Sequence, residues 1–141
     1  MSELTVGIGG FGAIGAKVAK ALDPNGAKGG MPGIKLVAVS ARDHDGARNR
    51  MDGMANPVPV VSLAELAGLA EVVVECAPAA VFAEVAEAAV EAGRIFIPLS
   101  CGALLQHPDL AARAAETGAR IIVPTGALVG LDAVRAASEG I

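Results

Sequence analysis

Glycines near the amino terminus carry the clearest chemical signal in the sequence. The segment Gly7–Gly15 reads G-I-G-G-F-G-A-I-G and contains the pattern G-x-G-x-x-G in two registers. In the second register, Gly10 permits a tight turn, Gly12 lets a pyrophosphate approach the backbone, and Gly15 lets the next helix pack closely on the strand. Backbone N–H groups at the helix start would face the phosphates. The pattern predicts a dinucleotide site containing Gly10, Phe11, Gly12, Ala13 and Ile14; the alternative is that these glycines only permit close packing.

A second candidate position lies at the end of the apolar stretch Ile34–Ser40. An NAD-specific domain usually carries Asp or Glu about 20 residues past the glycines, where it binds the ribose 2′-hydroxyl. Here Ser40 holds that place and Arg42 follows, and a hydroxyl with a guanidinium suits a 2′-phosphate better. We therefore expect NADP, or NAD, as the cofactor. In one alternative, Ser40 only ends the strand and Arg42 is a solvated charge. In another, Asp43 turns toward the ribose and serves NAD.

A dinucleotide site of this kind must be held in place by strands and helices. Apolar stretches and helical patterns do alternate along the chain. Strands are expected at 4–8, 34–40, 58–61, 71–76, 94–100 and 119–123, and helices at 13–22, 63–69, 79–92, 108–117 and 131–138. Residues 41–57 are polar and are expected to form a loop with at most one helical turn. Continuous apolar strands separated by helices are typical of a parallel sheet covered on both faces. The prediction is one α/β domain over 1–141, a Rossmann-type doubly wound parallel sheet of about six strands in the order 3-2-1-4-5-6.

Composition narrows the possible partners. The 141 residues are 53% hydrophobic and 18% charged, which is enough apolar material for a packed core. A net charge of −4 and an aromatic content of 2% argue against nucleic acid as a partner. We expect neither a membrane segment, because every stretch of 18 residues carries a charge, nor a disulfide framework or a metal site, because there are only two cysteines. A cytoplasmic location is the resulting expectation.

Three further segments, taken with the glycine loop, resemble the N-terminal half of L-aspartate dehydrogenases. They are V-V-E-C-A-P-A-A-V at 73–81, L-S-C-G-A-L at 99–104 and V-P-T-G-A-L-V-G-L-D-A-V-R-A-A at 123–137, and the last is the most specific. The resemblance covers residues 4–137. It implies oxidation of L-aspartate by NAD(P) to iminoaspartate, which enters NAD biosynthesis or hydrolyses to oxaloacetate and ammonia.

The resemblance also implies roles for individual residues. Cys76, Ala77 and Pro78 would form the turn beside the nicotinamide ribose, and Ala127 would touch the cofactor near its nicotinamide. In the family a second domain carries the catalytic histidine and builds a homodimer. Because the chain ends at Ile141, we expect no catalytic residue here and L-aspartate binding only with that domain. His44 and His107 match no catalytic position and are expected at the surface.

Several alternatives remain open at this point. The chain could be a stand-alone, non-enzymatic dinucleotide-binding module, or the cofactor domain of a homoserine dehydrogenase or a dihydrodipicolinate reductase. Glu71 and Glu75 flank an apolar strand and are expected to be strand-end charges. Cys76 and Cys101 follow neighbouring strands and are expected to be small buried residues rather than nucleophiles, because no activating base is recognisable. Ser100, Cys101 and Gly102 are expected to end the fifth strand.

Overall fold

Five strands and seven α-helices account for most of the computed structural model, which describes residues 2–26, 29–125 and 131–140. The strands are β1 (Leu4–Gly9), β2 (Ile34–Ser40), β3 (Val72–Glu75), β4 (Ile95–Pro98) and β5 (Arg120–Ile121). The helices are α1 (Ala13–Leu22), α2 (His44–Arg50), α3 (Leu63–Leu69), α4 (Phe82–Glu91), α5 (Cys101–Leu104), α6 (Asp109–Thr117) and α7 (Leu131–Ser138), with a short 3₁₀ turn at Ala79–Val81.

The strands form one parallel sheet in the order β2-β1-β3-β4-β5. Gly9 pairs with Ser40 on one side and with Glu75 on the other, and Glu75 pairs in turn with Pro98. These four residues form a row across the carboxyl edge of the sheet. Open parallel sheets bind their ligands beyond this edge, so the row fixes where a site can be built.

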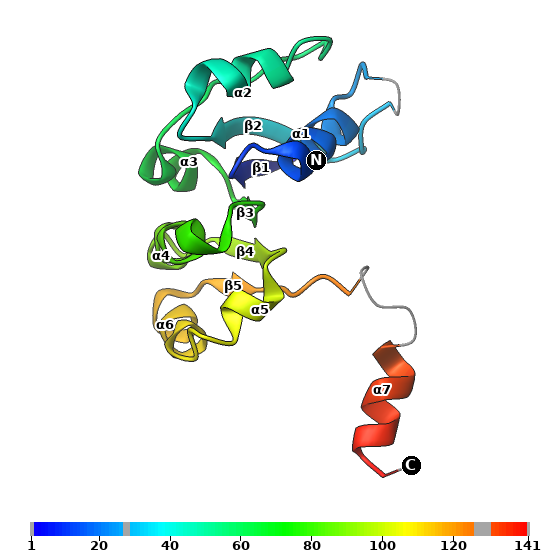
Figure 1. Ribbon diagram of the computed structural model, residues 1–141, viewed down its shortest axis with the longest axis vertical. Helices are drawn as coiled ribbons and strands as arrows, with labels where there is room; N and C mark the ends of the chain where they lie inside the picture. Colours follow the sequence, from blue (N-terminus) through cyan, green and yellow to red (C-terminus); the bar gives the residue numbers. More distant parts are fainter. Residues whose placement is uncertain (1, 27–28, 126–130, 141) are drawn as a thin grey trace.

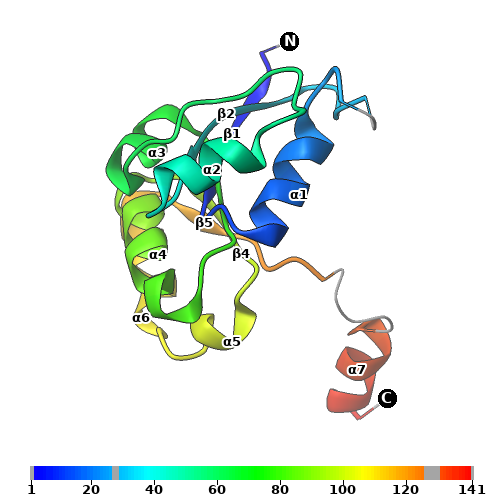
Figure 2. The same cartoon turned by 45° about the horizontal axis from the view of Figure 1, so that its top comes forward.

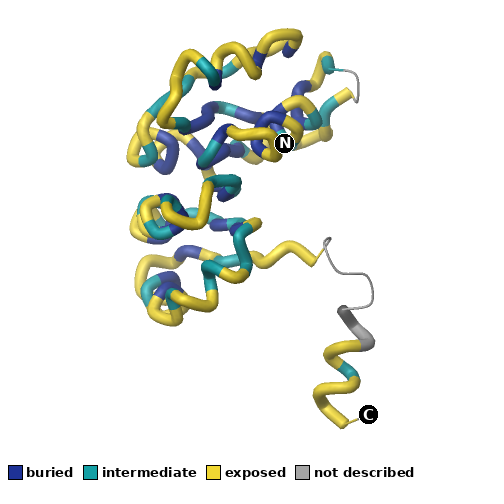
Figure 3. The backbone as a smooth tube through the Cα atoms, viewed as in Figure 1, coloured by how far each residue is buried: buried dark blue, intermediate teal, exposed yellow. Residues whose placement is uncertain are grey.

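Helices cover both faces of the sheet, as the continuous apolar strands require. Helix α1 lies on one face, and α3, α4 and α6 lie on the other (Figure 1). Neighbouring residues of β3 alternate between the two cores: Val72 packs with the α1 residues, whereas Val73 packs with Phe82 and other residues of α4. The buried residues concentrate in the strands and in the helix faces that meet them (Figure 3). The Rossmann-type, doubly wound prediction is therefore confirmed.

The third expected strand, 58–61, is reduced to a single bridge. Val60 pairs with Val39 in parallel, supported by the hydrogen bonds Val39 N to Pro59 O and Val61 N to Val39 O. Proline has no N–H to donate, so Pro57 and Pro59 cannot extend a continuous ladder. The sheet therefore has five strands rather than six, although the bridge lies beside β2, where the third strand was expected.

Helix α2 occupies a region expected to be mostly loop. It spans seven residues, and the Asp43 carboxylate caps it by accepting a hydrogen bond from Gly46 N at 2.9 Å. Only Ala47 within the helix is buried, so the sequence lacks the apolar stripe that identifies an amphipathic helix. Asp43 is the residue from which this helix could have been predicted, because Asp at the N-cap position favours a helix start.

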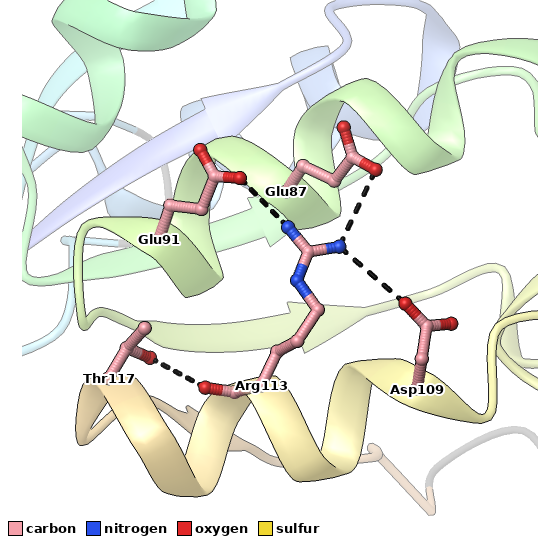
Figure 4. Close-up of polar contacts among 5 residues, drawn as sticks. All are labelled: Glu87, Glu91, Asp109, Arg113 and Thr117. Atoms are coloured by element: carbon pink, nitrogen blue, oxygen red, sulfur yellow. Dashed lines mark hydrogen bonds and ion pairs between the residues drawn. The ribbon is translucent and has the colours of Figure 1, made fainter.

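An arginine joins α4 to α6 on the far side of the sheet from α1. The Arg113 guanidinium lies 2.8 Å from Glu91 and 3.5 Å from Glu87, both on α4, and 3.6 Å from Asp109 on its own helix (Figure 4). The three carboxylates raise the pKa of Arg113 despite the opposing effect of burial. This cluster supports the helix layer that covers β3 and β4.

The carboxyl-terminal part departs from expectation at residues 100–102. Ser100 precedes the short helix α5, and Cys101 and Gly102 lie within that helix rather than at the end of a strand, because β4 already ends at Pro98. Helix α7 lies apart from the sheet and its covering helices (Figure 2). None of the helices in the described ranges is long and apolar enough to span a membrane.

Candidate cofactor-binding site

A cleft of about 550 Å³ opens at the carboxyl edge of the sheet. It brings together the glycine loop, the end of β2 and the turn after β3, and residues of α2, α3 and α4 complete its lining. The residues predicted from the sequence that line it are Gly10, Phe11, Gly12, Ser40, Arg42, Ala77 and Pro78. Three other predicted residues are not among the lining residues: Ala13 and Ile14, which are exposed at the start of α1, and Cys76, which is the half-buried first residue of the turn. Ala127 lies outside the described residues.

Gly10 and Gly15 are required by the shape of the loop. Gly10 has a φ of +97°, and a Cβ there would lie 2.6 Å from both the N and the Cα of Ala77. A Cβ at Gly15 would meet the carbonyl oxygen of Gly10. The loop therefore turns tightly, and it packs directly against the turn after β3, as the glycine pattern predicts.

Gly12 has a different environment. It is the N-cap of α1, with φ −86° and ψ −154°, and a Cβ there would have no neighbouring atom within 4 Å. No described side chain caps α1, and its first turn carries no acidic residue. The first N–H groups of a helix have no partner within the helix and attract anions. The open space before them fits a diphosphate, and this shape supports a dinucleotide in the cleft.

The end of β2 supplies the polar groups of the opposite part of the cleft. Ser40 is buried, and its carbonyl oxygen accepts a hydrogen bond from Gly10 N at 2.9 Å. Arg42 is exposed at the cleft, where Arg50 of α2 joins it. Asp43 also lines the cleft, but its carboxylate caps α2. Two guanidinium groups and one capping carboxylate thus line the same cleft as Ser40. Within the described ranges neither guanidinium forms an ion pair.

The turn at 76–78 is held by hydrogen bonds to the strands beside it. Cys76 N donates to Gly9 O at 2.8 Å, and Ala77 N donates to a Glu75 carboxylate oxygen at 2.8 Å. Burial, together with the Glu75 charge, raises the pKa of the Cys76 thiol to about 12. Since the thiolate is the nucleophile, this raised pKa argues against a nucleophilic role for Cys76 near neutral pH. Cys76 and Cys101 are both free and half-buried, rather than fully buried as expected.

Glu75 is not the strand-end charge expected from the sequence. Its side chain is fully buried, whereas Glu71, at the other end of β3, is exposed as predicted. Besides the bond from Ala77 N, the Glu75 carboxylate accepts bonds from Ser100 N at 2.9 Å and Ser100 Oγ at 3.1 Å. The prediction failed because strand position alone does not show that donors from two turns surround the carboxylate.

The histidines differ from one another. His44 is exposed at the start of α2, as expected, whereas His107 is half-buried and its ring stacks on Phe82 with centroids 5.5 Å apart. Within the described part of the chain, no three His, Cys, Asp or Glu side chains converge in a metal-binding arrangement. Cleft residues not predicted from the sequence are Ala41, Arg50, Leu63, Val81, Glu84 and Val85.

Comparison with known protein families agrees with this geometry. Residues 10–124 match the family described as the homoserine dehydrogenase NAD-binding domain. The chain belongs to this family. In this NAD-binding domain, the matched segment begins at the glycine loop and includes the end of β2 and the turn after β3, which together form the cleft.

Two curated relatives are similar in sequence over almost the whole of this NAD-binding domain. L-aspartate dehydrogenase 3 of Bordetella bronchiseptica is 46% identical over 138 residues, which is 98% of this chain and 49% of the relative. L-aspartate dehydrogenase of Bradyrhizobium diazoefficiens is 43% identical over 139 residues, 99% of this chain and 48% of the relative. The chain therefore spans about half the length of these relatives.

A solved structure supports the fold. The homoserine dehydrogenase of Thiobacillus denitrificans matches 87% of this chain with 30% of its own, at a TM-score of 0.69 and 18% identity. At this level of identity, the likeness concerns the arrangement of the sheet and helices.

Proposed function

We propose that this chain is the NAD(P)-binding half of an L-aspartate dehydrogenase. The observation that carries the proposal is the identity of 43–46% to proteins of that name over almost all of the chain. The cleft supports it, because the glycine loop, Ser40 and the 76–78 turn converge at one edge of the sheet. A role in NAD biosynthesis, a cytoplasmic location and a homodimer of the longer protein belong to the same proposal.

The residues of the cleft would bind and orient the dinucleotide. The N–H groups at the start of α1 would hold the diphosphate, with Gly12 leaving room for it. Ser40 and Arg42 would contact the adenosine ribose and favour a 2′-phosphate there. When bound, the nicotinamide would supply the acceptor for the hydride that leaves Cα of L-aspartate, and release of a proton from the amino nitrogen would complete the conversion to iminoaspartate. The groups that hold L-aspartate would come from outside these residues, as the catalytic histidine does in the family.

The proposal is tested by calorimetric titration of the 141-residue chain with NAD and NADP, followed by an assay for reduced nicotinamide with L-aspartate present. We expect dinucleotide binding without turnover, since hydride transfer needs the substrate held against the nicotinamide. Absence of binding would contradict the cofactor assignment. Reduction above background by this chain alone would show that its own residues complete the active site.

The homoserine dehydrogenase alternative rests on the family description and on a structural likeness at 18% identity. Both concern the cofactor domain, which related dehydrogenases share, and so neither distinguishes the substrate. The curated relatives at 43–46% identity are named for L-aspartate. Joining this chain to the remaining half of one such relative, and assaying L-aspartate against L-homoserine, would separate the two substrates.

A further inference from the structure

Glu75 is a buried carboxylate located between two turns at the cofactor edge. It is the last residue of β3, it pairs in the sheet with Gly9 and Pro98, and none of its surface is exposed. One oxygen accepts from Ala77 N at 2.8 Å and Ser100 Oγ at 3.1 Å, and the other accepts from Ser100 N at 2.9 Å. A single side chain thus connects the turn after β3 with the turn after β4.

These contacts determine what the 76–78 turn can offer a ligand. Cys76 N is bonded to Gly9 O, Ala77 N is bonded to Glu75, and Pro78 has no N–H. The turn therefore has no free backbone donor. By contrast, the carbonyl oxygens of Cys76 and Ala77 accept no backbone hydrogen bond within the described ranges. The backbone of the turn therefore offers acceptors and no free donor.

An acceptor surface discriminates between the parts of a dinucleotide. Phosphate oxygens only accept hydrogen bonds, and the free N–H groups at the start of α1 suit them. Ribose hydroxyl groups donate as well as accept, so they can bond to the carbonyl oxygens of the turn.

We infer that Glu75 is a positioning residue of the cofactor site: it holds the 76–78 turn as a donor-free surface for ribose hydroxyl groups and ties it to Ser100. The inference rests on the dinucleotide binding proposed above. In the competing explanation, Glu75 only strengthens the sheet. Glu71 illustrates that case, because at the other end of the same strand it accepts bonds from Thr5 N and Thr5 Oγ1, both at 3.0 Å, away from the cleft.

The test compares Glu75→Gln with the matched control Glu71→Gln in the 141-residue chain. The glutamine amide nitrogen cannot accept a hydrogen bond, so one donor from Ala77 or Ser100 loses its partner. Losing one charge-assisted bond predicts a rise of about tenfold in the Kd for NAD or NADP. Glu71→Gln changes the Kd by less than about twofold, because its contacts lie at the opposite edge. The Kd of each variant is measured under conditions in which circular dichroism shows that the variant is folded.

Inorganic pyrophosphate, which lacks ribose, is the second probe. We expect its competition with the dinucleotide to give the same affinity in wild type and Glu75→Gln, since the α1 N–H groups are unchanged. An equal loss for pyrophosphate and dinucleotide, or an equal loss in both glutamine variants, would mean a general structural effect and overturn the inference.

The remaining outcomes separate the inference from the proposed function. If the wild-type chain binds no dinucleotide, the proposed function and the inference fail together. If wild type binds and Glu75→Gln binds equally well, only the inference fails. If Glu75→Gln does not fold, Ser100→Ala and Ser100→Thr decide: weaker binding in the alanine variant that threonine restores supports the inference, and unchanged binding in the alanine variant overturns it.

Discussion

Gly12 offers a test of the cleft that separates binding from folding. A Cβ at Gly12 would have no protein neighbour within 4 Å, and the residue has a negative φ. Gly12→Val should therefore fold like wild type and bind dinucleotide at least about 100-fold more weakly, because the valine occupies the space of the diphosphate. Calorimetric titration and thermal unfolding of the same sample measure the two effects.

Gly10→Ala is the contrasting variant. Its φ of +97° and the Ala77 backbone 2.6 Å from the added Cβ require strain or displacement of the turn. The left-handed conformation alone costs roughly 1–2 kcal/mol for a residue with a side chain. We expect Gly10→Ala to have a lower Tm as well as weaker dinucleotide binding.

The Gly12→Val prediction has its own contradicting outcome. A Gly12→Val variant that binds like wild type would show that the diphosphate lies elsewhere.

Arg42 and Arg50 are expected to influence whether the cleft binds NADP more tightly than NAD. Both line the cleft near Ser40 and neither has an ion-pair partner among the described residues. We expect wild type to bind NADP about tenfold more tightly than NAD, since one partly exposed charge-assisted bond contributes about 1.4 kcal/mol. Arg42→Ala should remove most of this ratio, as measured by titration with each dinucleotide.

Arg50→Ala shows whether the second guanidinium shares the 2′-phosphate. A reduced ratio in this variant assigns part of the preference to α2, whereas an unchanged ratio restricts it to Arg42. Asp43 opposes the preference through its charge, although its capping bond from Gly46 N keeps the carboxylate at the start of α2. If NAD and NADP bind equally to wild type, Arg42 is only a surface charge.

The site residues differ in how far the sequence could identify them. The glycine positions follow from a spacing pattern whose steric reasons are visible at Gly10 and Gly15. Ser40 and Arg42 follow from their place at the end of a strand. Glu75 could not be predicted in the same way, because its role depends on a contact between positions 25 residues apart, Glu75 and Ser100. Arg50 was missed because it reaches the cleft from α2, in a region expected to be mostly loop.

At the scale of elements, the junction of α4 and α6 depends on one side chain. Arg113 interacts with Glu87, Glu91 and Asp109 (Figure 4). Arg113→Met would leave three carboxylates without their cation, so we expect a Tm lower by a few degrees. The difference from wild type should shrink in high salt, since salt screens the remaining repulsion. Thermal unfolding at low and high salt measures this.

Arg48→Met is the matched control for that measurement. Arg48 forms a single ion pair with Asp45, and both side chains are exposed, at 62% and 92%. Exposed pairs of this kind contribute little to stability, so the Tm should stay close to that of wild type. Equal effects of the two substitutions would contradict a special role of Arg113 between the helices.

Elements with a continuous apolar strand or a clear apolar stripe were predictable. The ranges of α1, β2, α3 and α7 agree with the expected ones. The 58–61 segment was wrong as a strand because Pro57 and Pro59 interrupt its donors, and α2 was missed because only Ala47 is buried. The short helix α5 begins after Ser100, where the apolar pattern of the preceding strand continues and hides the change of conformation.

At the scale of the whole molecule, three carboxylates predict how stability responds to acid. Hydrogen bonds from Asn56 to Asp23, from Ser62 to Glu65 and from Thr5 to Glu71 lower the pKa of each below its ordinary value of 3.8 for Asp or 4.5 for Glu. A group whose folded pKa is lowered stabilises the fold above its unfolded pKa. That stabilisation is lost as the pH falls through the folded pKa.

We therefore expect the Tm to be nearly constant near neutral pH and to fall progressively below about pH 4.5. Thermal unfolding between neutral pH and about pH 3 measures the profile. Asp23→Asn should make the acid decline shallower, because one of the three carboxylates no longer takes up a proton. A wild-type Tm that stays flat or rises in this range would contradict the assignment of these hydrogen bonds to the charged carboxylates.

Glu71, which precedes β3, and Glu75, which ends it, also influence the register in which β3 pairs with β1 during folding. The strand between them reads Val72-Val73-Val74, and identical residues do not distinguish the native pairing from one displaced along β1. The carboxylates do, because among the described residues Glu71 finds its donors at Thr5 and Glu75 finds its donors at Ala77 and Ser100. A displaced strand would bury Glu75 without partners, at a cost of several kcal/mol. Slipped, misfolded sheets are thereby penalised by the same residue that shapes the cleft.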